Sequence, residues 1–179
     1  MIYMFLAEGF EEVEALAPLD LIRRAGLEIK TVGVGGKVIT GSHGIPVTAD
    51  MTDAELADNA PDMVILPGGM PGTKNLDASE TVHKAIADAV KNDAYLCAIC
   101  AAPMILGKLG LLKGKNAVSY PGFESYLEGA TVPSEKVVRD GKIITAKGMG
   151  AAIEFGLAIV SALKDEKTAE DLAVATISK

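Results

Sequence analysis

Cys100 is the residue in this sequence best placed for covalent chemistry. The apolar run Tyr95–Ile99 precedes it and predicts a buried strand, and the residues from Ala101 onward have a helical composition. A cysteine at such a strand-to-helix turn projects from the sheet edge, and the dipole of the following helix favours its thiolate. The arrangement is similar to a nucleophile elbow, although the glycines usual in that motif are absent. The alternative is a buried structural cysteine, which is common.

Cys97 and Cys100 form a C-x-x-C pair, so a redox dithiol has to be considered. The extended chain between them separates their Cα atoms by roughly 10 Å, which exceeds the ~7 Å that a disulfide can bridge. Redox pairs of this type also begin at a helix N-terminus, whereas Cys97 lies within the predicted strand. We therefore interpret Cys97 as a core residue and Cys100 as the reactive one.

The acidic residues Glu11, Glu12 and Glu14 open a predicted helix. For Glu11 and Glu12, the favourable interaction of negative charge with a helix N-terminus is a sufficient explanation. Glu14 lies one turn further along, and its side chain could point back over the strand ends. A carboxyl group near Cys100 could shuttle a proton. Because a second anion beside a thiolate is costly, we expect Glu14 to hold or share a proton.

The turn Pro67-Gly68-Gly69 supplies free backbone N–H groups at the end of a predicted strand. Together with the amide of Ala101, which follows the cysteine, such groups can form an oxyanion hole. A Gly-Gly pair is more often only a turn. The sequence contains neither G-x-x-x-x-G-K-S/T nor a strand-linked G-x-G-x-x-G, so we find no nucleotide-binding fingerprint.

The two histidines, His43 and His83, do not complete an obvious Cys-His-Asp triad. His83 lies among charged residues in a predicted helix, which is typical of a solvated face. His43 lies in a turn and could reach a site, but nothing close to it in the sequence orients it. The spacing of the two histidines and two cysteines matches no common zinc pattern, so we predict no metal site.

Short apolar runs alternate along the chain with longer amphipathic segments. This alternation predicts a mainly parallel sheet with helices on both faces. The predicted strands cover Ile2–Leu6, Ile29–Val34, Met63–Leu66, Tyr95–Ile99 and Ala117–Ser119, with hairpins over Lys37–Val47 and Val137–Ala146. The predicted helices cover Glu11–Ala25, Ser79–Lys91, Ala101–Leu109, Ala151–Leu163 and Thr168–Ile177, and Pro18 should perturb the first of them.

The active sites of open parallel sheets lie at the carboxyl ends of the strands. This rule points to three loops, Ala7–Glu14, Pro67–Gly72 and Cys100–Pro103. These loops contain the cysteine, the acidic residues and the Gly-Gly turn described above, so we expect the candidates to meet at one edge of the sheet.

Length and composition indicate a single domain that spans all 179 residues and buries a large aliphatic core. The formal net charge of −7 disfavours a general nucleic-acid partner. Two cysteines are too few for a disulfide-rich secreted scaffold, and the N-terminus lacks the basic region of a signal peptide. The longest uncharged stretch, Ala94–Gly107, is too short for a membrane helix. We therefore expect a cytoplasmic protein with no membrane contact.

In their order and spacing, these residues resemble the DJ-1 branch of the DJ-1/ThiJ/PfpI superfamily. The acidic residue at position 14, the Gly-Gly pair and the A-I-C-A-x-P elbow make a specific signature in combination. The motifs that carry the resemblance are Ala7-Glu8-Gly9-Phe10-Glu11-Glu12-Val13-Glu14, Arg23-Arg24-Ala25-Gly26, Leu66-Pro67-Gly68-Gly69, Ala98-Ile99-Cys100-Ala101-Ala102-Pro103 and Gly148-Met149-Gly150-Ala151.

The resemblance implies a flavodoxin-like α/β/α sandwich that assembles as a homodimer. The reactive cysteine of the family corresponds to Cys100 and its acidic partner to Glu14. The oxyanion-hole glycine corresponds to Gly69, which acts beside the amide of Ala101. Arg24 falls in the Arg-Arg-Ala-Gly segment, which in the family lies near the dimer interface and an anion pocket.

Three positions depart from patterns of the superfamily. The protease-like branch has a histidine directly after the cysteine, and Ala101 at that position argues against peptidase activity. Some members carry a histidine in the loop after the next strand, where this chain has Tyr120. An arginine that is common in the small hairpin is replaced by His43, which would make the anion pocket weaker or dependent on pH. With Gly68, the side chains of Tyr120 and His43 are expected to line the substrate pocket.

The resemblance implies chemistry on small reactive dicarbonyls such as methylglyoxal. Cys100 would add to the aldehyde and Glu14 would move protons, releasing lactate without a metal, glutathione or another cofactor. Removal of dicarbonyl adducts, as in a deglycase, would use the same thiol. One alternative is an oxidative-stress sensor or redox-regulated chaperone that acts through oxidation of Cys100. A role in thiazole monophosphate biosynthesis is a further alternative, against which the missing phosphate-binding motif argues.

Overall fold

A central sheet organises the protein, whose computed structural model describes residues 1–56 and 60–179. The sheet has seven strands in the order β5-β2-β1-β6-β7-β9-β8. Neighbouring strands pair in parallel except for β8, which pairs antiparallel with β9. The strands are β1 (Ile2–Leu6), β2 (Ile29–Gly33), β5 (Met51–Thr52), β6 (Met63–Leu66), β7 (Tyr95–Ile99), β8 (Val137–Asp140) and β9 (Ile143–Ala146).

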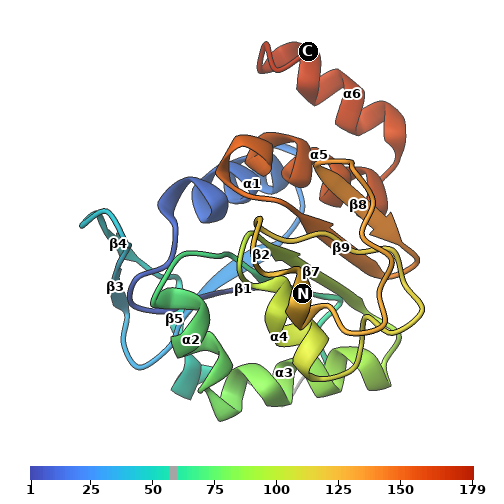
Figure 1. The fold of residues 1–179 in the computed structure, drawn as a ribbon. Helices are drawn as coiled ribbons and strands as arrows, with labels where there is room; N and C mark the ends of the chain where they lie inside the picture. Colours follow the sequence, from blue (N-terminus) through green and yellow to red (C-terminus); the bar gives the residue numbers. More distant parts are fainter. Residues whose placement is uncertain (57–59) are drawn as a thin grey trace.

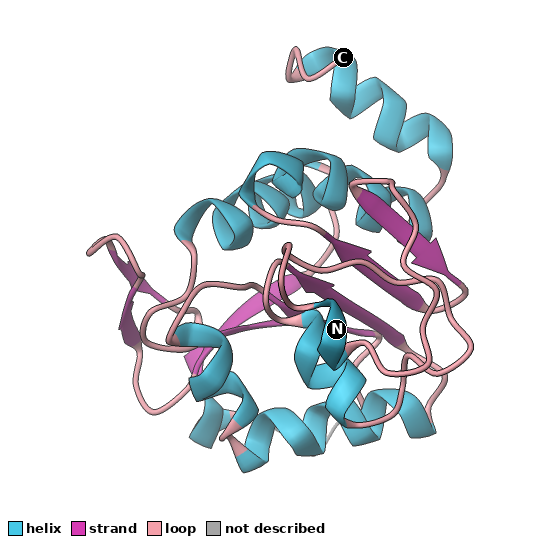
Figure 2. Cartoon of the chain, viewed as in Figure 1, coloured by secondary structure: helices cyan, strands magenta, loops and turns pink. Residues whose placement is uncertain are grey.

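Helices cover both faces of this sheet (Figures 1 and 2). One face packs against α1 and α5, with α6 lying on α5, and the opposite face packs against α2, α3 and α4. The helices are α1 (Glu12–Arg24), α2 (Gly72–Asp77), α3 (Glu80–Lys91), α4 (Pro103–Lys108), α5 (Ala152–Leu163) and α6 (Glu166–Ala175). The predicted mainly parallel α/β/α sandwich is confirmed.

Strand β1 shows why the sheet needs helices on both sides. All of its side chains are buried. Because successive residues of a strand point to opposite faces, Ile2, Met4 and Leu6 enter the core beneath α1 and α5. Tyr3 and Phe5 enter the core beneath the other helices. A continuous apolar run of this kind is stable only where both faces are covered.

The ends of the long helices follow their capping residues. Ser79 caps α3 by accepting a hydrogen bond from the amide of Val82. Gly26, at a φ of +68°, ends α1 in a Schellman motif, in which the amide of Leu27 donates to the carbonyl of Ile22 at 3.2 Å. Pro18 does not divide α1, which is a single helix of 13 residues.

The predicted hairpin over 37–47 is present as β3 (Val38–Thr40) and β4 (Pro46–Thr48), which turn at His43 and Gly44. The structure corrects the expected strand Ala117–Ser119. There the amide of Ala117 donates to a loop carbonyl and that of Val118 donates to the buried Thr145 side chain at 2.9 Å. Both edges of β9 are already paired, with β7 and β8, so this segment contacts β9 only through the Thr145 side chain and does not pair with it.

Several boundaries also differ from the predicted ones. The helix after the cysteine begins at Pro103 and not at Ala101, and α6 spans Glu166–Ala175. Sequence reasoning missed α2 and β5, since neither short segment carries a periodic apolar pattern. Among the described residues, no helix is both long and apolar enough to span a membrane.

The packing of α4 against the loop around Tyr126 yields a testable expectation. A Cβ atom at Gly107 would overlap the carbonyl oxygen of Tyr126. Gly107→Ala should therefore lower the free energy of unfolding by about 1–3 kcal/mol, as overpacking does, measured by urea denaturation. Gly36→Ala is the matched control, because its Cβ meets no atom closer than 4.0 Å. Equal stability of the two variants would contradict the expectation.

Candidate active site

The three predicted loops meet at the carboxyl edge of the sheet, around Cys100. This residue follows β7 directly and has a φ of +65°, a left-handed conformation that is uncommon for a residue other than glycine. The backbone is held there from two sides. The amide of Cys100 donates to the carbonyl of Ala146 at 2.9 Å, and its carbonyl accepts from the amide of Tyr120 at 2.7 Å. Backbone strain held in place by its surroundings is typical of functional sites.

The thiol of Cys100 is half-buried and lies between a carboxyl group and two backbone amides. Burial and the carboxyl of Glu14 raise the pKa of this thiol to about 12, while hydrogen bonds from the amides of Gly69 and Ala101 lower it. The expectation that a helix dipole would favour the thiolate is therefore wrong. Helix α4 is only six residues long and begins at Pro103, so Cys100 does not lie in its first turn.

Glu14 lies in the first turn of α1 and its side chain is almost completely buried, with 1% of its surface exposed. Its carboxyl group contacts the thiol of Cys100 and accepts hydrogen bonds from the amides of Gly68, at 3.0 Å, and Met149. Burial raises the pKa of Glu14 to about 7, because it outweighs the hydrogen bonds that favour the charged form. The expectation that Glu14 holds or shares a proton agrees with this environment.

Because the thiol and the carboxyl group are in contact, they titrate as a pair. The thiol has the higher pKa, about 12, and Glu14 the lower, about 7, so the pair keeps a proton across the neutral range and this proton lies mainly on the sulfur. Transfer of the proton to the carboxyl oxygen gives the alternative form. With the proton on Glu14, the sulfur is an anion that accepts hydrogen bonds from the amides of Gly69 and Ala101. That form has a nucleophile and an acid side by side.

The two glycines of the turn after β6 are required by close approach. A Cβ at Gly68 would lie 2.5 Å from Glu14 Oε2 and 2.6 Å from the Cβ of Cys100. Gly69 has a φ of +91°, and a Cβ there would overlap the backbone amide of Glu11. The two glycines therefore let the turn fit closely against Glu14 and Cys100, which an ordinary turn would not require.

Glu12 has a role that its sequence position did not reveal. Its buried carboxylate accepts hydrogen bonds from the amide of His43, at 2.8 Å, and from His43 Nδ1, at 2.9 Å. These bonds outweigh the effect of burial and lower the pKa of Glu12 to about 2, while the pKa of His43 is raised by the same contact. Glu12 thus fastens the β3–β4 turn to α1. Sequence reasoning had left His43 without an orienting partner.

Tyr120 borders a hollow of about 510 Å³ beside the Cys100–Glu14 pair, and Met149, Lys136 and Lys147 also line this hollow. A Cβ placed on Gly148 would lie 3.3 Å from the Tyr120 ring and 3.8 Å from Glu14 Oε1, so the hollow adjoins the carboxyl group. Sequence reasoning missed the contribution of the Met149 amide. Its signal was present in the Gly148-Met149-Gly150-Ala151 motif, which carried part of the family resemblance.

The remaining candidates lie away from this pair. Cys97 is fully buried within β7, and burial raises the pKa of its thiol, as expected for a core residue. Arg24 pairs with Asp20 at 2.6 Å on the exposed side of α1, and its expected place at a dimer interface stays a prediction. His83 Nε2 lies 2.7 Å from the carbonyl oxygen of Asp77 and is half-exposed.

Among the described residues, one group has the spacing of metal ligands. Ligand atoms of Glu11, Glu12 and His43 lie within 4.8 Å of one another. The carboxylate oxygens are already used, since Glu12 accepts from the β3–β4 turn and Glu11 accepts from the amide of Glu14. We infer no metal site from this group.

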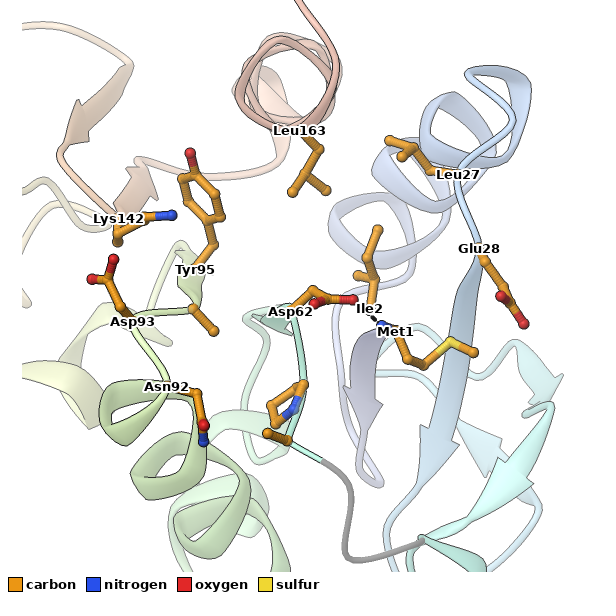
Figure 3. Close-up of a pocket in the computed structure, with 13 residues that line it drawn as sticks. Met1, Ile2, Leu27, Glu28, Asp62, Asn92, Asp93, Tyr95, Lys142 and Leu163 are labelled. Carbon is orange, nitrogen blue, oxygen red and sulfur yellow. Dashed lines mark hydrogen bonds and ion pairs between the residues drawn. The ribbon is translucent and has the colours of Figure 1, made fainter.

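A larger hollow of about 660 Å³ lies at the opposite edge of the sheet (Figure 3). It is formed where strands begin, and its lining includes Ile2, Tyr95 and Lys142, together with Asp62, which forms an ion pair with the N-terminal amine of Met1. Ligands of open parallel sheets bind at the carboxyl ends of the strands. The smaller hollow beside Glu14 therefore fits a functional site better than this one.

Comparisons with known proteins agree with this geometry. A family model described as the DJ-1/PfpI family matches residues 1–162. Protein dj-1beta of Drosophila melanogaster is 34% identical over 173 residues, which are 95% of this chain and 92% of that protein. A Caenorhabditis elegans protein named a glutathione-independent glyoxalase is 29% identical over 163 residues, which are 90% of this chain and 87% of that protein.

Solved structures give the same result. The crystal structure of Drosophila melanogaster DJ-1beta has a TM-score of 0.93 at 32% identity and covers 98% of this chain and 96% of that chain. Oxidized Toxoplasma gondii DJ-1 has a TM-score of 0.94 at 29% identity, with 98% and 97% coverage. The fold is thus the flavodoxin-like one of these structures. The family-model match and the identity to dj-1beta over almost the whole chain show that this protein belongs to the DJ-1/PfpI family.

Proposed function

We propose that this protein converts small reactive dicarbonyls, such as methylglyoxal, to hydroxy acids such as lactate without glutathione. The observation that carries the proposal is the contact between Cys100 and Glu14, which holds one proton between two groups under the amides of Gly69 and Ala101. The C. elegans relative that is named a glutathione-independent glyoxalase supports the same activity class.

The pair can perform the whole rearrangement with internal proton transfers. The Cys100 sulfur forms a bond to the aldehyde carbon, and the carbonyl oxygen takes the proton of Glu14 to give a hemithioacetal. The Glu14 carboxylate then removes the hydrogen of that carbon as a proton, and the resulting enediol is protonated on the neighbouring carbon. This step oxidises the former aldehyde to a thioester and reduces the ketone to an alcohol. Water cleaves the thioester, which releases lactate and restores the thiol.

The surroundings of the pair suit these charges. The amides of Gly69 and Ala101 are free to donate to the developing oxyanion once the sulfur has formed its covalent bond. The hollow lined by Tyr120, Gly148 and Met149 lies next to the Glu14 carboxyl group and offers space for a dicarbonyl on this side of the pair. Because its volume of about 510 Å³ far exceeds that of methylglyoxal, dicarbonyl adducts of larger molecules are a second substrate class, as in a deglycase.

A redox-sensing role for Cys100 ranks second. The half-buried Cys100 is accessible, in contrast to the buried Cys97, which favours oxidation at this position. Only the thiolate reacts readily with peroxide, and burial and Glu14 raise the pKa of the Cys100 thiol to about 12. The proposed catalytic role needs the thiolate only in the presence of a bound substrate, so the structure favours catalysis over sensing.

Removal of the sulfur should abolish the activity. Cys100→Ala is expected to reduce lactate formation from methylglyoxal to background, because the other thiol, that of Cys97, is buried. Cys97→Ala is the matched control and should retain the wild-type rate, since Cys97 lies within the core of β7. Lactate is measured enzymatically after removal of the protein. Equal rates for wild type and Cys100→Ala would overturn the proposal.

The rate should depend on the protonation of Glu14. Below pH 7 the pair holds both protons, so kcat/KM should fall as the pH is lowered through about 7, the raised pKa of Glu14. Glu14→Gln removes both the proton donor and the base, and should lower kcat by roughly 10²–10⁴-fold and abolish this inflection. Stopped-flow loss of methylglyoxal against pH gives both values. An unchanged inflection in Glu14→Gln would show that another group is titrating.

A further inference from the structure

Glu11, the residue that caps α1, contacts both parts of the site. Its Oε2 accepts a hydrogen bond from the amide of Glu14 at 2.7 Å. Its own amide donates to the carbonyl oxygen of Gly68 at 2.9 Å. That carbonyl and the amide of Gly69 belong to one peptide group. Glu11 therefore fixes the direction of the N–H group that points at the sulfur of Cys100.

These bonds form a capping box in which one of the two usual bonds is redirected. In the usual motif, the side chain of the third helical residue bonds back to the amide of the capping residue. Here the third helical residue is Glu14, and its carboxyl group instead contacts Cys100 and the amide of Gly68. The amide of Glu11 that it leaves free is satisfied by the carbonyl of Gly68. The helix cap and the site thus share one set of hydrogen bonds.

Glutamate is a poor choice if capping is the only requirement. Serine, threonine, aspartate and asparagine are the preferred capping residues. Compared with serine or asparagine, Glu11 adds a negative charge, and this charge lies next to the buried carboxyl group of Glu14. A residue that departs from a local preference beside a buried titratable pair is a candidate for a functional role.

We propose that Glu11 is the positioning residue of the Cys100–Glu14 pair: its amide fixes the Gly68–Gly69 peptide, and its negative charge shifts the shared proton toward Glu14, which increases the fraction of molecules whose sulfur carries the anion. This inference deepens the proposed function and rests on the same pair. Glu11 touches neither the sulfur nor the substrate in this account, and it acts through Glu14.

The electrostatic interactions of Glu11 favour a proton on Glu14 over a proton on the thiol. The charge of Glu11 is among the causes that raise the pKa of Glu14, after burial. The thiol of Cys100 is governed by burial, by Glu14 and by the amides beside it. A charge that acts more strongly on the carboxyl group than on the thiol moves the single proton toward the carboxyl group.

The other charged groups that face this region compensate each other. Glu12 and His43 lie beside Glu11 and form an ion pair at 2.9 Å while His43 is protonated. The remaining groups around Glu14 are the thiol of Cys100 and the amides of Gly68 and Met149. When the pH rises above the raised pKa of His43, this residue loses its positive charge and the Glu12–His43 pair becomes net negative. The comparison of variants should therefore be made at equal pH across the whole titration.

The test compares two substitutions that both keep a good helix cap. Glu11→Asp retains the charge and Glu11→Asn removes it. The rate of Cys100 alkylation by iodoacetamide, followed by mass spectrometry between pH 5 and 10, reports the thiolate fraction. Between the two titrations of the pair, Glu11→Asn should react several-fold more slowly than wild type, and its acidic inflection should move to lower pH. Glu11→Asp should keep both features close to wild type.

Two results would overturn the inference. One is a Glu11→Asn profile that matches wild type, and the other is a Glu11→Asp profile as slow as that of Glu11→Asn, since the charge would then not be responsible. Thermal unfolding separates a merely structural role, which would lower stability without moving the inflection. If Glu11→Asn fails to fold, Glu11→Ser serves as a second uncharged cap.

A double-mutant comparison assigns the path of the effect. In a Glu14→Gln background, the difference between Glu11→Asn and Glu11→Asp should vanish, because Glu11 acts through the Glu14 carboxyl group. A difference that persists at full size would overturn the inference. Alkylation needs no substrate, so these results stand whether or not the protein forms lactate. Absence of lactate with a charge-dependent profile would reject the proposed function and leave the role of Glu11 intact.

Discussion

A buried carboxyl group against a thiol is the constraint on which the rest of the site depends. Glu14 has a pKa of about 7 in place of 4.5, so the native state binds a proton that the unfolded chain has released over this range. Stability is therefore lost as the pH rises from 4.5 to 7, by about 3 kcal/mol at 1.36 kcal/mol for each pKa unit. The same burial that causes this cost brings the pKa of Glu14 close to neutral pH.

The geometry of the surrounding loops follows from that contact. Glu14 reaches Cys100 only because Gly68 leaves no Cβ between them. The left-handed backbone of Cys100 turns its thiol toward the helix, and bonds from β9 and from the Tyr120 loop hold it there. The amides that face the sulfur come from Gly69, after β6, and from Ala101, after β7. Two adjacent parallel strands and the first helix therefore supply the site from one sheet edge, where the topology brings their ends together.

The parts of this arrangement that sequence reasoning predicted are those set by local patterns. The bounds of β1, β6 and β7 follow from continuous apolar runs, and Cys100 follows from its place directly after such a run. The thiol pKa was predicted in the wrong direction, since a helix-dipole argument ignores burial by residues distant in the sequence. The bond between Glu12 and the β3–β4 turn connects positions 31 residues apart, and no local signal marks it.

The same distinction explains why the site is the place where local preferences are broken. A non-glycine residue in left-handed backbone, a buried carboxyl group and a glutamate cap are each unfavourable alone. The surrounding fold follows local preferences closely, with β1 buried on both faces and α1 closed by a Schellman motif at Gly26. That regular packing is what can hold strained groups in fixed positions. The unfavourable choices therefore gather around one thiol, at the sheet edge where the surrounding packing can hold them.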